Sequence, residues 1–150
     1  MRIAFETPDQ PDVHALIAEL DDHLYALYPA ANVFALDVAA LLHPNVLFAV
    51  ARDTAGAALG CGAVVVTPEY GEIKRMYVRP AARGQGLARR LLLALEAQAS
   101  ALGCTAFVIE TGPTLYEALA LYERLGYKYR GAFGDYLDDP LSVFMQKVVQ

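Results

Sequence analysis

Apolar residues along the chain follow two spacings, and the change of spacing predicts where helices and strands lie. Over residues 13–27 they recur every three or four positions, the period of an amphipathic helix, and Tyr28-Pro29 is expected to end it. Thr7 is placed to cap this helix, with Gln10 as its capping-box partner. Shorter apolar runs, several rich in β-branched residues, predict strands over 2–6, 46–52, 57–67, 72–78, 105–110, 127–130 and 141–149.

The remaining helical patterns fall between these strands. The expected helices cover residues 36–42, 84–102 and 115–125. Gly103 and Gly126 each stand just past the end of a helix, where a left-handed residue is common. Residues 72–110 therefore form a strand–helix–strand unit, whose crossover length suits parallel neighbours. The strands within 46–67 are joined by a short turn, which predicts an antiparallel hairpin.

Composition narrows the kind of protein. The chain has 150 residues, of which 56% are hydrophobic and 19% charged, so we expect one domain over residues 1–150 with a sizeable core. The net charge of -5 argues against nucleic acid or an anionic membrane as a partner. The first residues lack the apolar core of a secretory signal, and no apolar run is long enough to span a membrane, so a cytoplasmic location is expected.

Metal and disulfide chemistry is not expected from the sequence. Cys61 and Cys104 lie far apart among small or apolar residues, and the three histidines have no ligand spacing. We therefore expect two buried thiols and no metal site.

A glycine-rich junction at residues 78–90 separates a strand from the long helix. Gly84 and Gly86 let successive backbone N–H groups turn toward one point, and the start of the helix adds a positive dipole end. Half of the 12 basic residues lie at or near this junction: Lys74, Arg75, Arg79, Arg83, Arg89 and Arg90. These features predict an anion site, although a tight structural turn with solvated arginines would carry the same residues. A Walker loop is excluded because no Gly-Lys-Ser or Gly-Lys-Thr follows, and Arg89 stands where a dinucleotide turn needs its third glycine.

Two segments resemble landmarks of the GNAT superfamily of N-acetyltransferases. Residues 78–88 contain its acyl-coenzyme A signature, Arg/Gln-x-x-Gly-x-Gly/Ala, with Arg83, Gly86 and Ala88 in the defined positions. Residues 118–127 are similar to the second landmark, Ala-x-x-Leu-Tyr-x-x-x-Gly-Phe/Tyr. The order of elements agrees from about residue 47 onward. One departure is residue 115, where relatives often carry asparagine and this chain has leucine.

The resemblance implies an α+β fold and a coenzyme site. The expected fold is a central mixed, mostly antiparallel sheet of about six to seven strands flanked by about four helices, with its parallel strand–helix–strand unit splayed at the coenzyme. Acetyl-CoA would be the co-substrate, and no metal would be needed. Its pyrophosphate would lie on the turn formed by Arg83, Gly84, Gln85, Gly86, Leu87 and Ala88. Its pantetheine arm would meet the backbone of Met76, Tyr77 and Val78.

Acetyl transfer to an amine needs a proton acceptor and a proton donor, because an alkylammonium with a pKa of about 10.4 is not nucleophilic. Glu72 is the candidate base, the alternative being an ion pair with Lys74. Tyr122 stands where the family's tyrosine donor stands, the alternative being a core aromatic. The glycine-hinged loop at 131–142 offers candidates for acceptor contact, unless it is a plain solvated loop: Asp135, Tyr136 and Ser142.

These residues favour an N-acetyltransferase that moves an acetyl group directly from acetyl-CoA to a primary amine of a small, amino-acid-like or polyamine-like molecule. The alternatives are a non-catalytic acyl-CoA sensing module and a protein or peptide N-acetyltransferase. The expected partners are acetyl-CoA and the amine, with no nucleic acid and no membrane, and the sequence leaves a homodimer open.

Overall fold

A mixed β-sheet forms the centre of the protein in the computed structural model, which describes residues 1–149. Its strands are β1 (Arg2–Phe5), β2 (Val46–Arg52), β3 (Ala58–Val66), β4 (Gly71–Val78), β5 (Ala106–Thr111), β6 (Lys128–Arg130) and β7 (Val143–Val148). Their order in the sheet is β1-β2-β3-β4-β5-β7-β6. The β4–β5 pair is parallel and the other five neighbouring pairs are antiparallel. The predicted α+β sheet, hairpin and parallel unit are thereby confirmed.

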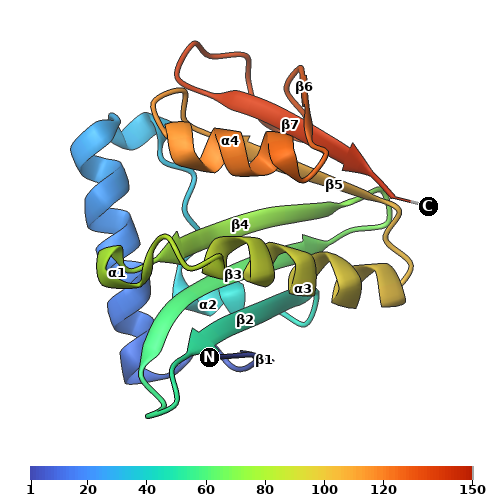
Figure 1. Ribbon diagram of the computed structural model, residues 1–150. Coiled ribbons are helices and arrows are strands. Elements are labelled where there is room, and N and C mark those ends of the chain that lie inside the picture. The colour runs from blue at the N-terminus through green and yellow to red at the C-terminus, as the bar shows by residue number, and fades with distance from the viewer. Residues whose placement is uncertain (150) are drawn as a thin grey trace.

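Helices cover both faces of this sheet (Figure 1). The α-helices are α1 (Pro11–Leu27), α2 (Val38–Leu41), α3 (Leu87–Ala101) and α4 (Tyr116–Arg124), and single 3-10 turns lie at η1 (Ala30–Asn32) and η2 (Pro80–Ala82). The leucine stripe of α3 is buried with Tyr122 of α4 in one core cluster, whereas the apolar stripe of α1 forms another with Leu41 of α2. The apolar side chains of the strands divide between the two clusters, as the period-two alternation of a strand requires.

The parallel strands β4 and β5 separate partway along their length. Their pairing ends at Ile73 and Ile109, yet β4 continues to Val78 and β5 to Thr111. The two strands diverge beyond that point in Figure 1. We call this region the fork. It confirms the predicted splay of the parallel unit and leaves one edge of β4 without a strand partner.

A β-bulge in β4 lies just beyond the start of the fork. Arg75 has a φ of 58°, and the register against β3 shifts between Cys61 and Ala63. The bulge turns two consecutive side chains toward the face that α1 covers, because Lys74 contacts Tyr136 and Arg75 contacts Asp21 of α1. A regular strand would have pointed them to opposite faces.

Some predicted boundaries were wrong, for local reasons. The long helix begins at Leu87 rather than residue 84, because Gly84 and Gly86 have φ values of 77° and 76° and so lie outside a right-handed helix. Helix α1 begins at Pro11, and Thr7 does not cap it: the Thr7 hydroxyl accepts a hydrogen bond from Asp9 N. The predicted capping box therefore does not form. The other ends differ by two residues or fewer.

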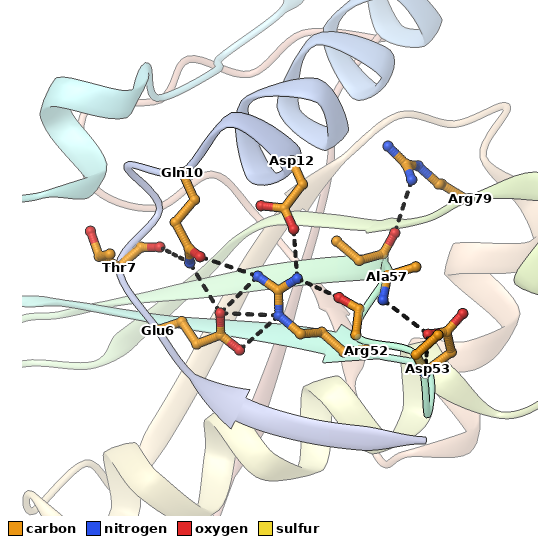
Figure 2. A network of polar contacts seen from close by, with 11 residues as sticks. Glu6, Thr7, Gln10, Asp12, Arg52, Asp53, Ala57 and Arg79 are labelled. Atoms are coloured by element: carbon orange, nitrogen blue, oxygen red, sulfur yellow. Dashed lines mark hydrogen bonds and ion pairs between the residues drawn. The ribbon is translucent and has the colours of Figure 1, made fainter.

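Hydrogen bonds from Arg52 connect the segment between β1 and α1, and the start of α1, to the β2–β3 hairpin (Figure 2). Its guanidinium donates to Glu6 Oε1 at 2.9 Å, to Asp12 Oδ2 at 2.5 Å and to the carbonyl oxygen of Gly56 at 2.8 Å. The Arg52 side chain is 9% exposed and that of Glu6 19%. Hydrogen bonds from Arg52 lower the pKa values of both carboxyl groups. The network satisfies a buried charge and fixes where α1 starts.

An Arg52→Met variant is expected to be less stable by about 3 kcal/mol, because it leaves Glu6 buried without its partner. Both carboxyl pKa values are lowered in the folded state, so the stabilisation is present above their ordinary values of 4.5 and 3.8 and disappears as the pH falls through the lowered ones. The difference in unfolding free energy between variant and wild type, measured in urea, should therefore become smaller as the pH is lowered through this range. Arg2→Met, at an exposed position of β1, is the control and should change stability by less than about 0.5 kcal/mol. Equal stability of the Arg52 variant at neutral pH would contradict the role of the network.

Candidate active site

The turn before α3 presents a row of free backbone donors. The N–H of Arg83 donates to Pro80 O at 3.3 Å, which closes the 3-10 turn. Within residues 1–149, none of the six N–H groups from Gly84 to Arg89 donates to an acceptor, and the N-cap Gly86 has no side chain to supply one. Residues 83–86 are exposed. Six free donors at the start of a 15-residue helix are an arrangement suited to binding an anion, and we call this turn the nest.

The two glycines of the turn keep the space above it open. A Cβ at either position would have no heavy atom within 4 Å, so their positive φ values, rather than crowding, require glycine. The Arg83 side chain stabilises the turn through contacts with β4. Its Nε donates to Val78 O at 2.9 Å and its guanidinium lies 5.8 Å from the centre of the Tyr77 ring.

The free edge of β4 continues from this nest into the fork. The side chains along it are engaged in packing: Met76 belongs to the α3-side core, and the Tyr77 hydroxyl donates to Glu19 at 3.2 Å. Val78 is buried. The backbone of residues 74–78 on the β5 side has no strand partner among the described residues, and apart from Val78 O, which accepts from Arg83 Nε, an extended ligand can pair with this edge as an added strand would.

Tyr122 lies on the same face of the sheet as α3. Its side chain is 5% exposed, and its ring packs against Tyr127 with centroids 5.9 Å apart. Its hydroxyl forms no hydrogen bond to any residue in the part of the chain that the structure describes. Burial raises the pKa of Tyr122 to about 12, so the phenol keeps its proton near neutral pH. Leu115, where relatives often have asparagine, is the N-cap of α4 and provides no side-chain cap.

A polar cluster occupies the opposite face at the fork. The Tyr136 hydroxyl donates to Glu72 Oε2 at 2.6 Å and accepts from Lys74 Nζ at 2.7 Å. Lys74 and Glu72 also form an ion pair at 3.4 Å, with side chains 12% and 16% exposed. The structure therefore brings two residues predicted from distant segments, Glu72 and Tyr136, into direct contact. It also shows the Glu72–Lys74 ion pair that was the structural alternative.

Glu110 is the member of this cluster that the sequence did not single out. It follows Ile109, the last residue of β5 that pairs with β4, and so lies across the fork from Lys74. Burial raises the pKa of Glu110, while the Ser142 hydroxyl and the charge of Lys74 oppose part of the rise. A glutamate ending an apolar strand was a visible signal, but its position depends on the register between two strands.

The other two residues predicted to contact the acceptor, Ser142 and Asp135, lie in different environments. Ser142 lies beside Glu110, and its buried hydroxyl makes no well-formed hydrogen bond among residues 1–149. Asp135 is exposed, and its charge acts on Tyr70 rather than on the ion pair at the fork.

The two cysteines are buried free thiols, as predicted. Burial raises the pKa of Cys61 to about 12 and also raises that of Cys104, so neither forms a thiolate readily. Among the described residues, no group of three or more His, Cys, Asp or Glu side chains is arranged to hold a metal ion. No helix over residues 1–149 combines the length and apolar character needed to cross a membrane.

Comparison with known proteins gives consistent matches. The model of the acetyltransferase (GNAT) family matches residues 9–127. An IAA acetyltransferase from Azospirillum brasilense is 47% identical over 147 residues, which cover 97% of this chain and 95% of that protein. YsnE of Bacillus subtilis (strain 168), an uncharacterized N-acetyltransferase, is 31% identical over 138 residues, or 88% of this chain and 91% of its own length.

Solved structures agree over nearly the whole chain. A protein from Klebsiella pneumoniae provisionally described as an acyl-CoA N-acyltransferase has a TM-score of 0.87 at 40% identity, covering 99% of this chain and 97% of that one. An aminoglycoside 6'-N-acetyltransferase complexed with coenzyme A shares the fold with a TM-score of 0.75 at 18% identity, again covering 99% and 97%.

Proposed function

The chain belongs to the acetyltransferase (GNAT) family, and on that premise we propose that it transfers an acetyl group from acetyl-CoA directly to the primary amine of a small molecule. The observation that carries the proposal is the row of six unpaired N–H groups before α3, next to the fork; Tyr122, whose hydroxyl has no hydrogen-bond partner among the described residues, belongs to the core cluster on the same face of the sheet. The nest is suited to the pyrophosphate through the free N–H groups from Gly84 to Ala88, while Arg83, whose N–H donates to Pro80 O, supports the turn through its bond to Val78 O. The open edge of β4 from Met76 to Val78 is suited to the pantetheine arm.

Direct transfer in a ternary complex is favoured because neither cysteine among residues 1–149 is a reactive nucleophile. Both thiols are buried with raised pKa values, so a covalent acyl-cysteine is not supported. Acetyl-CoA supplies an acetyl group activated as a thioester. The protein's tasks are then to orient the amine, remove its proton and protonate the leaving sulfur.

The reaction needs two groups that transfer protons, a carboxylate as the base and Tyr122 as the acid. A carboxylate at the fork accepts a proton from the acceptor ammonium, which frees the nitrogen lone pair for attack on the acetyl carbonyl carbon. The C–N bond forms, the C–S bond breaks, and Tyr122 gives its proton to the departing sulfur. The new amide loses a second proton, which restores Tyr122. The balance is one ammonium and one thioester giving one amide, one thiol and one released proton.

Glu110 and Glu72 are the carboxylates that could accept the proton. Glu72 already accepts a 2.6 Å hydrogen bond from Tyr136 and pairs with Lys74, and these contacts orient Tyr136. Glu110 has no basic partner within ion-pair distance among the described residues. Its pKa is raised toward neutral pH, which suits a general base. We therefore assign the base to Glu110 and a positioning role to Glu72, which was the base predicted from the sequence.

The pH dependence of turnover distinguishes the two carboxylates. A base must be ionised, so kcat/KM should fall as the pH drops through the raised Glu110 pKa, at a higher pH than an ordinary glutamate would give. Glu110→Gln should lower kcat about 100-fold and remove this acid limb, while leaving coenzyme A binding unchanged. Glu72→Gln should keep the limb. If instead Glu72→Gln removes the limb and Glu110→Gln retains it, Glu72 is the base.

Thiol release from acetyl-CoA across a panel of primary amines tests the activity itself. The proposed function requires release that depends on both the amine and acetyl-CoA. Coenzyme A binding without turnover on any amine would support the non-catalytic sensing module, and turnover confined to peptides would support a peptide N-acetyltransferase.

A further inference from the structure

Two half-buried groups of opposite charge, Lys74 and Glu110, flank the fork on the face that carries Tyr136. Lys74 and Glu110 each follow the last residue of their strand in the β4–β5 pairing, so they lie across the fork from one another, near enough for the charge of Lys74 to act on Glu110. Lys74 donates to Tyr136 and lies 3.4 Å from Glu72, which leaves at least one of its three ammonium protons without an acceptor among residues 1–149. Lys74 on one side of the fork can therefore still bind an anion, and Glu110 on the other side can still bind a cation.

Arg75 adds a second buried cation on this face, because the bulge turns it in the same direction as Lys74. Its side chain is 2% exposed, and Nη2 lies 2.8 Å from Asp21 Oδ1. Its buried Nε and Nη1 atoms have no hydrogen-bond partner in the described part of the chain. Lys74 pairs with Glu72 and Arg75 with Asp21, so Glu110 is the carboxylate of this cluster that has no basic ion-pair partner among the described residues, whereas a polyamine carries several ammonium groups.

Aromatic rings border the charged groups. Phe34 is 39% exposed and meets the Tyr136 ring edge-on, with centroids 5.1 Å apart. Tyr136 in turn packs against Phe133 and Phe144 at 5.0 and 5.6 Å. This wall offers apolar surface next to the Lys74–Glu110 pair, and Phe34 is the ring left open to solvent.

We propose that the acceptor is an amino acid with an apolar side chain, whose ammonium group lies at Glu110, whose carboxylate lies at Lys74 and whose side chain lies along Phe34 and Tyr136. The assignment rests on the proposed function for the transfer step. A zwitterion satisfies both unfilled interactions at once, whereas a simple amine leaves Lys74 unpaired and a polyamine places a second cation against it.

The test compares acceptors that differ only by the carboxylate: phenylalanine against phenethylamine, and leucine against isoamylamine, with spermidine as a third class. Wild-type protein with acetyl-CoA should prefer each amino acid by about 100-fold in kcat/KM, a typical effect of one buried charge pair. Lys74→Met should remove the preference, mainly by raising KM for the amino acids. Lys74→Arg should retain most of it, and Lys128→Met, at an exposed position of β6, should leave it intact.

Calorimetric binding of phenylalanine and phenethylamine to coenzyme A-saturated protein gives a second readout that needs no turnover. Wild-type protein should bind phenylalanine more tightly than phenethylamine, and Lys74→Met should lose this preference. Equal or better use of the simple amine or spermidine would overturn the proposal, as would a preference that survives in Lys74→Met. Failure of the proposed function shows differently, as no thiol release with any acceptor, and the binding preference then still decides the assignment of Lys74.

Discussion

A Gly86→Glu variant is expected to lose coenzyme A affinity by on the order of a thousandfold, or about 4 kcal/mol. Two effects add. A non-glycine residue at a φ of 76° costs about 1–2 kcal/mol, so the turn either strains or rearranges its N–H groups. The new carboxylate also places a negative charge at the nest that is proposed to hold the pyrophosphate. Calorimetry with coenzyme A measures the loss directly.

Gly56 provides a matched control for that variant. It has a φ of 89° and nothing within 4 Å of a Cβ, but it lies in the β2–β3 turn. Gly56→Glu therefore introduces the same charge and the same backbone strain away from the nest, and its coenzyme A affinity should match that of wild type. Gly86→Ala isolates the strain and should lose about tenfold. Wild-type affinity in Gly86→Glu would show that the pyrophosphate does not bind at this turn.

Tyr122→Phe is expected to lower kcat by between about 100-fold and 10,000-fold, the usual contribution of a positioned general acid. The hydroxyl makes no hydrogen bond to the described residues, so its removal breaks no internal contact, and folding stability should change little. Coenzyme A affinity should stay within a few-fold of wild type. Thiol release at saturating substrates, together with a thermal unfolding curve, makes the comparison.

Tyr116→Phe is the control on the same helix, because Tyr116 is 72% exposed and should tolerate the change without effect. If Tyr122→Phe retains full kcat, the tyrosine is only a core aromatic and another group protonates the sulfur. A variant that loses stability in proportion to its activity would lead to the same conclusion.

The fold could be predicted well because its signals are local. The leucine spacing of α3, the apolar runs of β2 and β3 and the glycines after helices each act within a few residues. The errors came from backbone geometry that side-chain patterns do not encode. Gly84 and Gly86 look like the first residues of a helix in sequence, but their left-handed φ values delay it to Leu87.

For the candidate site, the sequence pointed mainly to groups that a single segment carries. The nest from Gly84 to Arg89 is contiguous, so its donors follow from the sequence. The Lys74–Glu110 pair depends instead on the register of two strands separated by a helix, and the common orientation of Lys74 and Arg75 depends on a bulge. Such relations arise from tertiary packing, and no period or propensity in a single sequence reports them.

Backbone amide NMR during a coenzyme A titration tests the central claim most directly, because hydrogen bonding to phosphate shifts the resonances of the donating N–H groups. The amide signals of residues 84–89 should move together on addition of coenzyme A, with Gly84 and Gly86 readily identified, while Gly56 and Gly103 stay unchanged. Pantothenate, which lacks the pyrophosphate, should leave the nest signals in place. Saturation by coenzyme A without movement of residues 84–89 would contradict the assignment of this turn.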